Sequence, residues 1–594
     1  MKYSDFMCLQ LKNMGYTHCF TLTGGNIMHL IESASNYFEM VPVVNEVAAG
    51  IAVEYFNESN PDKKAFALVT AGPGLTNIIT AISGAYLESR ELLVIGGQVK
   101  VSDLSHGKVR QNGIQEVDGI ALTKPITNHC EVLTAPINSR DFSKIIQKGS
   151  SGRAGPVFIE APLDVQAKDI DEKEFDQGVV DLSNSDLPKI TDDDLDKVIK
   201  SISDSKRPVI LLGGGVSRTV AAKIEDKLIK LNIPVQLTWN AADRIGSDHG
   251  LYFGRPNTWG QRYANIIIQQ SDLLIAVGTR LGLQQSGFNW QEFIPSGKII
   301  HVDIDEKELN KGHPITDQKI KCDANDFIEK VVNSRVDGGD FNEWVEHCRL
   351  IRKELPLNEK QHNKIRDGYI LSHDLCESLS EISGNNDIMI PCSSGGSFTS
   401  MMQIFEQKKG QTIVSDKALA SMGYGLSGAI GCAIANPQKR VILTEGDGGF
   451  SQNLQELAIV DYHKLNLKIF LFENSGYASI RMTQKNYFKG KYVGCDNNTG
   501  LGFPDWFKIF DAYNIKSHEI KSKDFTKDAK ILDAFNAEGP AAFIVRTDPE
   551  QTYLPKIASK VAKDGGMVSN PLHAMSPDLD DQLKSKLIKY INDK

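Results

Sequence analysis

The stretch VILTEGDGGF, residues 441–450, runs from an apolar segment into an aspartate, Asp447, that stands between two glycines. The apolar part does not alternate with polar residues, as expected for a parallel strand that helices cover on both faces. Runs of the same kind occupy residues 65–70, 92–97, 156–162, 208–215, 273–278, 298–305, 387–392, 468–474 and 541–547. Helix-like stretches separate them, so the sequence predicts an α/β fold of doubly wound parallel sheets.

The chain has 594 residues, which is too many for one hydrophobic core. Two stretches interrupt the strand pattern: residues 165–190 are acidic, and residues 334–366 are charged and helix-like with a Gly-Gly break. As linkers, they predict three domains, each of the size of a doubly wound sheet. The predicted domains span residues 1–165, 190–335 and 366–550, and a tail spans residues 551–594.

The composition sets limits on partners and compartment. A formal net charge of −9 disfavours binding to nucleic acid or to an anionic membrane. Nine cysteines without a CxxC pair suit the reduced thiols of a cytoplasmic enzyme. The N-terminus lacks the apolar run of a signal peptide, and no stretch reaches the length that spans a bilayer. We expect a soluble cytoplasmic protein with no nucleic-acid or membrane partner.

Asp447 is a candidate metal ligand. Gly446 and Gly448 carry no Cβ, so a large group could approach the backbone where the strand ends. A helix predicted from about Phe450 would direct its N-terminus at this point and favour an anion. A carboxylate beside a phosphate is a reasonable Mg²⁺ site. A GDG turn by itself is also compatible with a tight turn and a solvated aspartate.

The next predicted strand supplies further oxygen ligands. After 24 intervening residues, 449–472, the chain reads Glu473-Asn474-Ser475-Gly476. This spacing accommodates one helix and one strand, so the two loops should lie side by side at one edge of the sheet. The Asn474 amide oxygen and the Gly476 carbonyl would join Asp447 around the metal, leaving room for a diphosphate and water.

This arrangement resembles the metal-binding signature of thiamine-diphosphate enzymes. Their asparagine pair usually begins with Asn, where this chain has Glu473. The segment VPVVNEVAAGIAVEYF places Glu46 after a short apolar strand and before a helix of small residues. In the resemblance Glu46 aligns with the glutamate that activates the aminopyrimidine ring. The alternative role is a first-turn glutamate that interacts with the helix dipole.

Other segments are similar to the acetolactate synthase and decarboxylase branch of this superfamily. They are TAGPGLTN (70–77), GIQEVDG (113–119), SSGGSF (393–398) and ALASMGYG (418–425), and the resemblance spans residues 1 to about 550. It implies that Met422 bends the cofactor while the Ala420 carbonyl and the Met422 N–H bond the aminopyrimidine. It implies catalytic roles for Glu46, Gln115 and Asn26. It implies cofactor contacts at Gly25, Thr70, Pro73, Asn77, Gly395, Gly396, Ser397, Ala420, Met422, Gly446, Asp447, Gly448, Gly449, Asn474, Gly476, Tyr477 and Ala478.

The resemblance implies decarboxylation of a 2-oxo acid, with pyruvate as our hypothesis, and transfer of the acyl unit to a carbonyl acceptor. GYASIRMTQ and the tail resemble acetolactate-synthase-like proteins of surface-polysaccharide pathways, so a keto-sugar nucleotide is one candidate acceptor. An acetolactate synthase or a simple decarboxylase is the alternative. Candidate substrate contacts are Thr23, His106, Arg110, Met482 and Thr483, although the basic loop that carries His106 and Arg110 could also be an ordinary solvated loop.

The central domain has a weaker signal. PVILLGGGVSR (208–218) ends a strand in three glycines where acetolactate synthases hold FAD. FGRPNTWGQRYAN (253–265) replaces an element that helps those enzymes to bind FAD, so FAD binding and a purely structural domain both remain open. GGGVSR does not follow the GxGxxG spacing of a dehydrogenase. The resemblance also implies a homodimer or homotetramer with the active site between subunits. A non-catalytic relative would typically have lost Glu46, Asp447 or Asn474.

Overall fold

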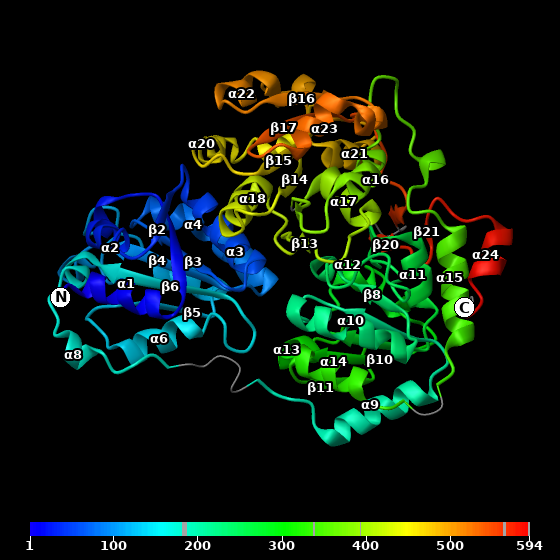
Figure 1. The fold of residues 1–594 in the computed structure, drawn as a ribbon, viewed down its shortest axis with the longest axis horizontal. Helices are drawn as coiled ribbons and strands as arrows, with labels where there is room; N and C mark the ends of the chain where they lie inside the picture. Colours follow the sequence, from blue (N-terminus) through cyan, green and yellow to red (C-terminus); the bar gives the residue numbers. More distant parts are fainter. Residues whose placement is uncertain (181–186, 337–338, 393, 562–565, 592–594) are drawn as a thin grey trace.

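The computed structural model describes residues 1–180, 187–336, 339–392, 394–561 and 566–591. Ser393, the first residue of the SSGGSF segment, lies outside the described residues. Figure 1 shows three sheet domains, with the N-terminal domain at one side and the last part of the chain returning to the central domain. None of the helices in the described ranges has both the length and the apolar character needed to cross a bilayer.

The N-terminal domain is a six-stranded parallel sheet with the order β2-β1-β3-β4-β6-β5. Its strands are β1 (Tyr16–Thr21), β2 (Glu39–Pro42), β3 (Lys64–Val69), β4 (Leu92–Gln98), β5 (His129–Val132) and β6 (Pro156–Pro162). Its helices are α1 (Tyr3–Asn13), α2 (Met28–Ala34), α3 (Glu46–Ser59), α4 (Pro73–Glu88), α5 (Gly119–Thr123), α6 (Ser139–Gln147), α7 (Leu163–Gln166) and α8 (Glu172–Phe175). Separate apolar clusters cover the two faces of the sheet, one with α1 and α6 and the other with α3 and α4.

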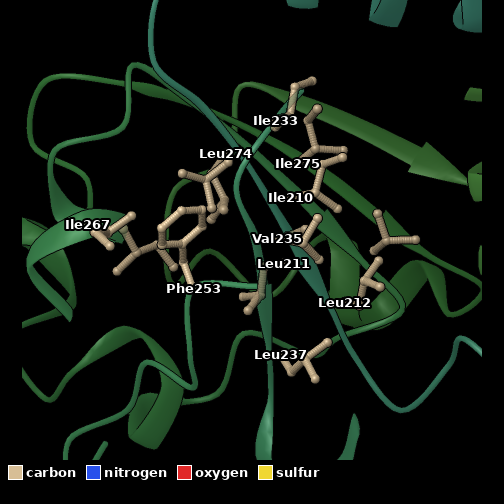
Figure 2. Packing of buried hydrophobic residues seen from close by; sticks show 14 of the residues in the cluster. Ile210, Leu211, Leu212, Ile233, Val235, Leu237, Phe253, Ile267, Leu274 and Ile275 are labelled. Carbon is tan, nitrogen blue, oxygen red and sulfur yellow. The ribbon is translucent and has the colours of Figure 1, made fainter. Parts of the chain in front are cut away.

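The central domain is a five-stranded parallel sheet with the order β11-β10-β9-β7-β8. Its strands are β7 (Pro208–Leu212), β8 (Val235–Leu237), β9 (Leu273–Val277), β10 (Lys298–Asp303) and β11 (Gln318–Lys321). Its helices are α9 (Asp192–Asp204), α10 (Arg218–Leu231), α11 (Arg262–Gln269), α12 (Leu283–Ser286), α13 (Glu306–Leu309) and α14 (Ala324–Asn333). Figure 2 shows side chains of β7, β8 and β9 packed together in the core of this domain.

The C-terminal domain has six parallel strands with the order β13-β12-β14-β15-β17-β16. They are β12 (Ile388–Ile390), β13 (Thr412–Ile413), β14 (Val441–Gly446), β15 (Leu467–Glu473), β16 (Ser517–Ile520) and β17 (Ala541–Arg546). The helices are α16 (Ser372–Ile382), α17 (Gly395–Ile404), α18 (Tyr424–Ala435), α19 (Asp447–Phe450), α20 (Leu457–Tyr462), α21 (Ala478–Tyr487), α22 (Trp506–Ala512) and α23 (Ala529–Asn536). Counted along the chain, this strand order is the same as in the N-terminal domain.

The fold confirms the predicted class, and each of the ten apolar runs contains a strand of one of the three sheets. The prediction of a helix from about Phe450 is wrong. The chain instead makes the four-residue helix α19, a 3-10 turn at Leu454–Glu456, and then α20. Asn453 has a non-helical backbone, and its side-chain amide donates to the Gly423 carbonyl (2.8 Å), so a tertiary contact interrupts the helix. A one-turn helix has little dipole, so the anion argument at Asp447 no longer rests on it.

The N-terminal and C-terminal domains pack through α3 and α18, whose apolar side chains share one core cluster. Small residues permit the close approach: a Cβ on Gly431 would lie 2.0 Å from the Ala52 carbonyl oxygen. Two carboxylates make reciprocal contacts between the domains. Glu88 accepts from the N–H groups of Lys417 and Ala418, and Glu456 accepts from those of Val44 and Asn45. Each carboxylate belongs to the helical segment after the third strand of its own domain.

The chain after β17 returns to the central domain. It forms two short antiparallel pairs, β18 (Lys556–Ile557) with β21 (Met575–Ser576) and β19 (Ser559–Val561) with β20 (Met567–Ser569), and then α24 (Asp581–Leu587). Side chains of this return segment join the central core, as do those of α15 (Asn342–Glu354). The members from the two regions are Phe341, Trp344, Val345, Cys348, Ile351, Leu355, Ile557, Leu572, Met575 and Leu587.

Candidate active site

The predicted metal site lies at the point where the strand order of the C-terminal sheet reverses. β12 and β14 are neighbours in the sheet, and the chain leaves them in opposite directions to build the two halves. Crevices at such points, at the carboxyl ends of the strands, are the usual ligand sites of open α/β sheets. The loop after β14 carries Asp447, and the loop after β12 leads into Gly395 at the start of α17.

Asp447 is a buried carboxylate that ties two loops together. It is 1% exposed, and its Oδ1 accepts from the N–H of Gly448 (2.8 Å). Its Oδ2 accepts from the N–H groups of Asn474 (3.0 Å) and Ser475 (2.8 Å). Burial raises its pKa to about 7 even though the N–H donors act in the opposite direction. A carboxylate this far from water favours a nearby cation.

The loop after β15 has the arrangement of a ligand loop. The buried guanidinium of Arg481 donates through Nη2 to the Asn474 carbonyl (2.9 Å) and to Asn474 Oδ1 (3.0 Å), which fixes the orientation of that amide. Ser475 adopts a positive φ of 56°, a strained backbone that the Asp447 hydrogen bond supports. Glu473 accepts from the Ser475 hydroxyl (2.8 Å) and pairs with Arg546, its neighbour in register on β17. This ion pair gives the acid at position 473 a structural role.

The glycines around Asp447 serve different purposes. A Cβ on Gly446 or Gly395 would meet no atom within 4 Å, so both positions border open space. A Cβ on Gly448 would lie 2.4 Å from the Tyr477 ring, so this glycine is needed for side-chain packing rather than for an approaching diphosphate. Similarly, a Cβ on Gly396 would lie 2.2 Å from the hydroxyl oxygen of Tyr553. The expected approach of a large group is therefore retained at Gly446 and not at Gly448.

The segment before α18 is held in a strained form. Ala420 has a φ of 56°, and Asp416 Oδ1 accepts from its N–H (3.0 Å). Met422 follows with 37% of its surface exposed, a high value for a large apolar side chain beside a core helix. Glu445, buried in β14, accepts from the Leu426 N–H (3.1 Å) and anchors the start of α18; burial raises its pKa to about 8.

The predicted residues of the N-terminal domain also gather at the carboxyl ends of its strands. Asn77 Nδ2 donates to Glu46 Oε2 (2.9 Å), and Glu46 is 4% exposed at the first position of α3. Gly24, in the loop that carries Thr23, Gly25 and Asn26, lies against Thr70. Pro73 begins α4 beside them.

Gln115 lies in the same cluster, with a φ of 62° and its carbonyl against Gly72. Its neighbour Glu116 organises the loop: burial would raise its pKa, but N–H donors from Ser105, Asn112 and Gly113 lower it to about 2. The predicted basic residues of this loop point to solvent rather than to the cluster. His106 and Arg110 are exposed, and no hydrogen bond or ion pair joins them to the other predicted site residues in the described part of the chain.

Comparison with known proteins identifies the domains. The N-terminal TPP-binding domain of thiamine pyrophosphate enzymes matches residues 1–122, their central domain matches residues 195–331, and their C-terminal TPP-binding domain matches residues 394–545. The chain belongs to the thiamine pyrophosphate enzyme family. Thiamine pyrophosphate is thiamine diphosphate, so the resemblance that the GDG and asparagine motifs indicated is confirmed at the level of the family.

Curated relatives in this family are named acetolactate synthases. The chain is 28% identical to a probable acetolactate synthase large subunit of Methanocaldococcus jannaschii, covering 96% of this chain and 95% of that protein. It is 28% identical to the acetolactate synthase isozyme 1 large subunit of Escherichia coli, covering 93% and 95%. A probable acetolactate synthase large subunit of Methanococcus aeolicus is also 28% identical, with 89% of each chain covered. The similarity extends through all three domains.

The residues of the C-terminal domain fit the magnesium and diphosphate that the family implies. Asp447 is buried and short of a counter-cation, and Asn474 Oδ1 and the Gly476 carbonyl are hard oxygen donors on the adjacent loop. Because an amide oxygen has two lone pairs, Asn474 could hold a metal while it accepts from Arg481. Open space at Gly446 and Gly395 provides the approach.

The glycine-rich turn of the central domain does not fit the phosphates of FAD. The N–H of Gly213 donates to the Val277 carbonyl (2.8 Å), and the N–H of Gly215 donates to the Gly278 carbonyl (2.9 Å). A Cβ on Gly213 would lie 2.2 Å from the Gly278 oxygen. Two of the three glycine N–H groups that would bind phosphate are thus in use, and the glycines let two loops pack against each other.

Sequence reasoning missed several charged residues that shape the site. Glu88, Glu456 and Asp416 hold the loops that carry predicted cofactor contacts, and Glu445 anchors α18. Arg481 lies seven residues after Asn474, a distance at which one turn of loop and one turn of helix bring it back to the asparagine. An arginine at that position in GYASIRMTQ was the available signal.

Proposed function

We propose that this protein catalyses the thiamine-diphosphate- and Mg²⁺-dependent decarboxylation of a 2-oxo acid, with pyruvate as donor, and transfers the acyl unit to a carbonyl acceptor. The observation that carries the proposal is the buried Asp447 carboxylate linked to Asn474 on the adjacent loop. A second cluster around Glu46 supports it. When bound, thiamine diphosphate supplies a nucleophilic carbon that adds to a ketone and takes up the electrons released with CO₂.

The chain's own residues would bind and orient the reactants. Asp447, Asn474 and the Gly476 carbonyl would hold Mg²⁺, and the Ala420 carbonyl would accept from the amino group of the pyrimidine ring. Glu46 would share a proton with a ring nitrogen, while the Asn77 side chain donates to its Oε2 and keeps the carboxyl group in place. Met422, exposed in this chain, offers an apolar support for the cofactor.

The acceptor is the finer part of the proposal. Met482 and Thr483 on α21 occupy the region where acetolactate synthases carry a tryptophan that helps to select a 2-oxo acid. Thr483 is exposed, and its hydroxyl donates to the Ser479 carbonyl (3.0 Å), so this position presents a polar side chain to an acceptor. We propose a keto-sugar nucleotide or another polar ketone. The second candidate is acetolactate formation from two pyruvates, which the names of the relatives favour.

The positions of the two clusters support a homodimeric active unit. Within one chain Glu46 contacts Asn77 in the first turn of α4, whereas Glu88 at the last turn contacts Lys417 and Ala418, next to Ala420. Eleven residues of helix separate these contacts by about 16 Å. One small cofactor ring would have difficulty reaching both, so we propose that a second chain supplies the other half of each site.

Incubation of the purified protein with thiamine diphosphate, Mg²⁺ and pyruvate that carries ¹⁴C in its carboxyl group tests the proposal. We expect labelled CO₂ that depends on both cofactors, and mass spectrometry of the products separates acetolactate from acetaldehyde and from an acylated sugar. Absence of CO₂ with pyruvate and with longer 2-oxo acids would overturn the donor assignment. Release of acetolactate in the presence of sugar nucleotides would favour the second candidate.

A further inference from the structure

The chain between the C-terminal and central domains, residues 551–557, is held in place over α17 and α21; we call it the crossing segment. Asn363 Oδ1 accepts from the Leu554 N–H (2.9 Å), Gln403 donates to the Pro555 carbonyl (2.8 Å), and the Ile557 N–H donates to the Thr258 carbonyl (3.0 Å). These contacts reach the C-terminal domain and the central domain. The side chains of the segment therefore have defined positions.

Lys556 in this segment is a half-buried cation without a carboxylate. Its Nζ lies 3.4 Å from Met482 Sδ and 5.3 Å from the centroid of the Trp259 ring. In the described ranges no carboxylate oxygen comes within 4.0 Å of this Nζ. Burial lowers the pKa of Lys556. A thioether and an aromatic face compensate an ammonium group only weakly for lost water.

Lys485, on the same helix as Met482, shows the usual arrangement. Its Nζ lies 2.7 Å from Glu550 Oε2, and both side chains are exposed to solvent. In the described part of the chain, the exposed Lys485 therefore has a carboxylate partner and the more buried Lys556 has none. A cation kept from water without a counter-ion is typical of a group that meets its partner on binding.

The position of Lys556 places it beside the candidate active site. Met482, which it contacts, follows Arg481, whose guanidinium holds the metal ligand Asn474. Three residues before Lys556, Tyr553 is 4% exposed and its hydroxyl abuts Gly396 at the start of α17. Three residues of extended chain cover at most about 10 Å between Cα atoms, and the ammonium group itself lies 3.4 Å from the sulfur of Met482, a predicted substrate contact.

We propose that Lys556 is an anion-binding residue of the substrate site. Its ammonium group exchanges a weak sulfur contact for a charge-assisted hydrogen bond to an oxyanion of the substrate. The inference rests on the proposed function for the identity of that substrate. The anion is either the carboxylate of the 2-oxo acid donor or a phosphate group of the acceptor. Both present oxyanions that can accept a hydrogen bond from an ammonium group.

Calorimetric titration of the protein with thiamine diphosphate and Mg²⁺ bound tests this assignment independently of turnover. Oxalate serves as the carboxylate probe and inorganic phosphate as the phosphate probe. We expect Lys556→Met to weaken binding of at least one probe by about tenfold or more, and Lys556→Arg to restore part of it. Lys485→Met is the matched control and should bind both probes as the wild type does.

The pattern of losses identifies the source of the anion. Loss of oxalate affinity together with a raised KM for pyruvate and a smaller change in kcat assigns Lys556 to the donor. Loss of phosphate affinity alone assigns it to the acceptor. The inference is overturned if Lys556→Met, with an unchanged melting temperature, binds both probes as tightly as the wild type. Failure of the wild type to release CO₂ would instead count against the proposed function, since the titrations do not depend on it.

Discussion

Asp447 shows how one residue combines a structural and a chemical role. Its carboxylate joins the loops after β14 and β15 through three backbone N–H groups, and this tie positions Asn474. Burial strengthens these hydrogen bonds, but it also deprives the negative charge of solvation by water. A divalent cation would compensate this charge directly, because carboxylate oxygens are preferred ligands of Mg²⁺.

Asp447→Ala should therefore abolish metal-dependent cofactor binding. We expect the affinity for thiamine diphosphate in the presence of Mg²⁺ to fall more than about 100-fold, beyond the loss typical of an outer-shell change. Isothermal titration calorimetry measures this affinity. Asp461→Asn, at a half-buried aspartate that pairs with Lys464, provides a control. Glu46→Gln should instead retain cofactor affinity while CO₂ release falls. Equal affinities for Asp447→Ala and the wild type would exclude the metal role.

At the scale of elements, the packing of α18 against α3 depends on glycines inside helices. Glycine costs a helix interior about 1 kcal/mol relative to alanine, so its presence needs a reason. In α18 the reason is contact: a Cβ on Gly428 would lie 2.4 Å from the Tyr55 ring, and one on Gly431 would meet the backbone of Ala52. The two helices approach so closely because these positions carry no side chain.

Gly431→Ala should destabilise the protein by about 1–3 kcal/mol, since the backbone of α3 cannot move aside like the end of a flexible side chain. Urea unfolding measures the change, and Gly502→Ala, at a position with no atom near the added methyl, should stay within about 0.5 kcal/mol of the wild type. A Gly431→Ala protein as stable as the wild type would mean that the two helices can separate without cost.

Most central strands were predictable from the sequence, and most edge strands were not; the central strand β1 (Tyr16–Thr21), which includes Thr17 and His18, was missed. The ten apolar runs correspond to strands buried on both faces, for example β9 and β15. Strands at sheet edges, such as β5, β11 and β16, are only partly buried and carry polar residues, so they lack a continuous apolar run. β8 and β13 are edge strands of three and two residues, too short to give a pattern.

The same limit applies to the candidate site. Asp447, Asn474 and Glu46 stand at strand ends with local signatures, and the structure places each at the carboxyl edge of its sheet. Glu88 and Lys556 have no local signature because their partners lie on elements far away in the chain, whereas Arg481 lies only seven residues after Asn474. The prediction of a helix after Asp447 was wrong for a similar reason. The contact of Asn453 with Gly423 that interrupts the helix is a tertiary contact.

At the scale of the whole molecule, two domains of identical strand order pack face to face in one chain. The reciprocal contacts of Glu88 and Glu456 follow this correspondence, because each carboxylate reaches the loop after the edge strand of the other domain. The arrangement keeps Glu46 and Ala420 at opposite ends of α4. This arrangement supports our proposal that a second chain completes each site.

Mixing two inactive variants tests this assembly. Glu46→Gln and Asp447→Ala disable different halves of the site, so a mixed dimer holds one site with both defects and one with neither. We expect co-refolded or co-expressed variants to recover up to about one quarter of wild-type CO₂ release, from half of the sites in the half of dimers that are mixed. Light scattering should give a dimer or a larger assembly. No recovery despite subunit exchange would place each site within one chain.

The domain interface should also make stability depend on pH. Burial raises the pKa of Glu456 to about 7, although N–H donors from Val44 and Asn45 lower it. The native chain then binds more protons than the unfolded chain from about pH 4.5 to 7, so the free energy of unfolding should fall as the pH rises through this window. Urea unfolding of the cofactor-free protein at pH 5 and pH 8 measures the fall. Glu456→Gln should reduce it, and an equal fall in the variant would exclude Glu456 as a source.

The sequence by itself determined the fold class and the class of cofactor. Both depend on local patterns: apolar runs of strand length, and acid, amide and glycine residues at the points where those runs end. Tertiary structure alone decided what surrounds these residues. It half-buried Lys556 with no carboxylate oxygen within 4.0 Å in the described part of the chain, and it brought Glu88 to the N–H groups of Lys417 and Ala418. Burial and charge pairing join residues far apart in the chain, and no local pattern specifies them.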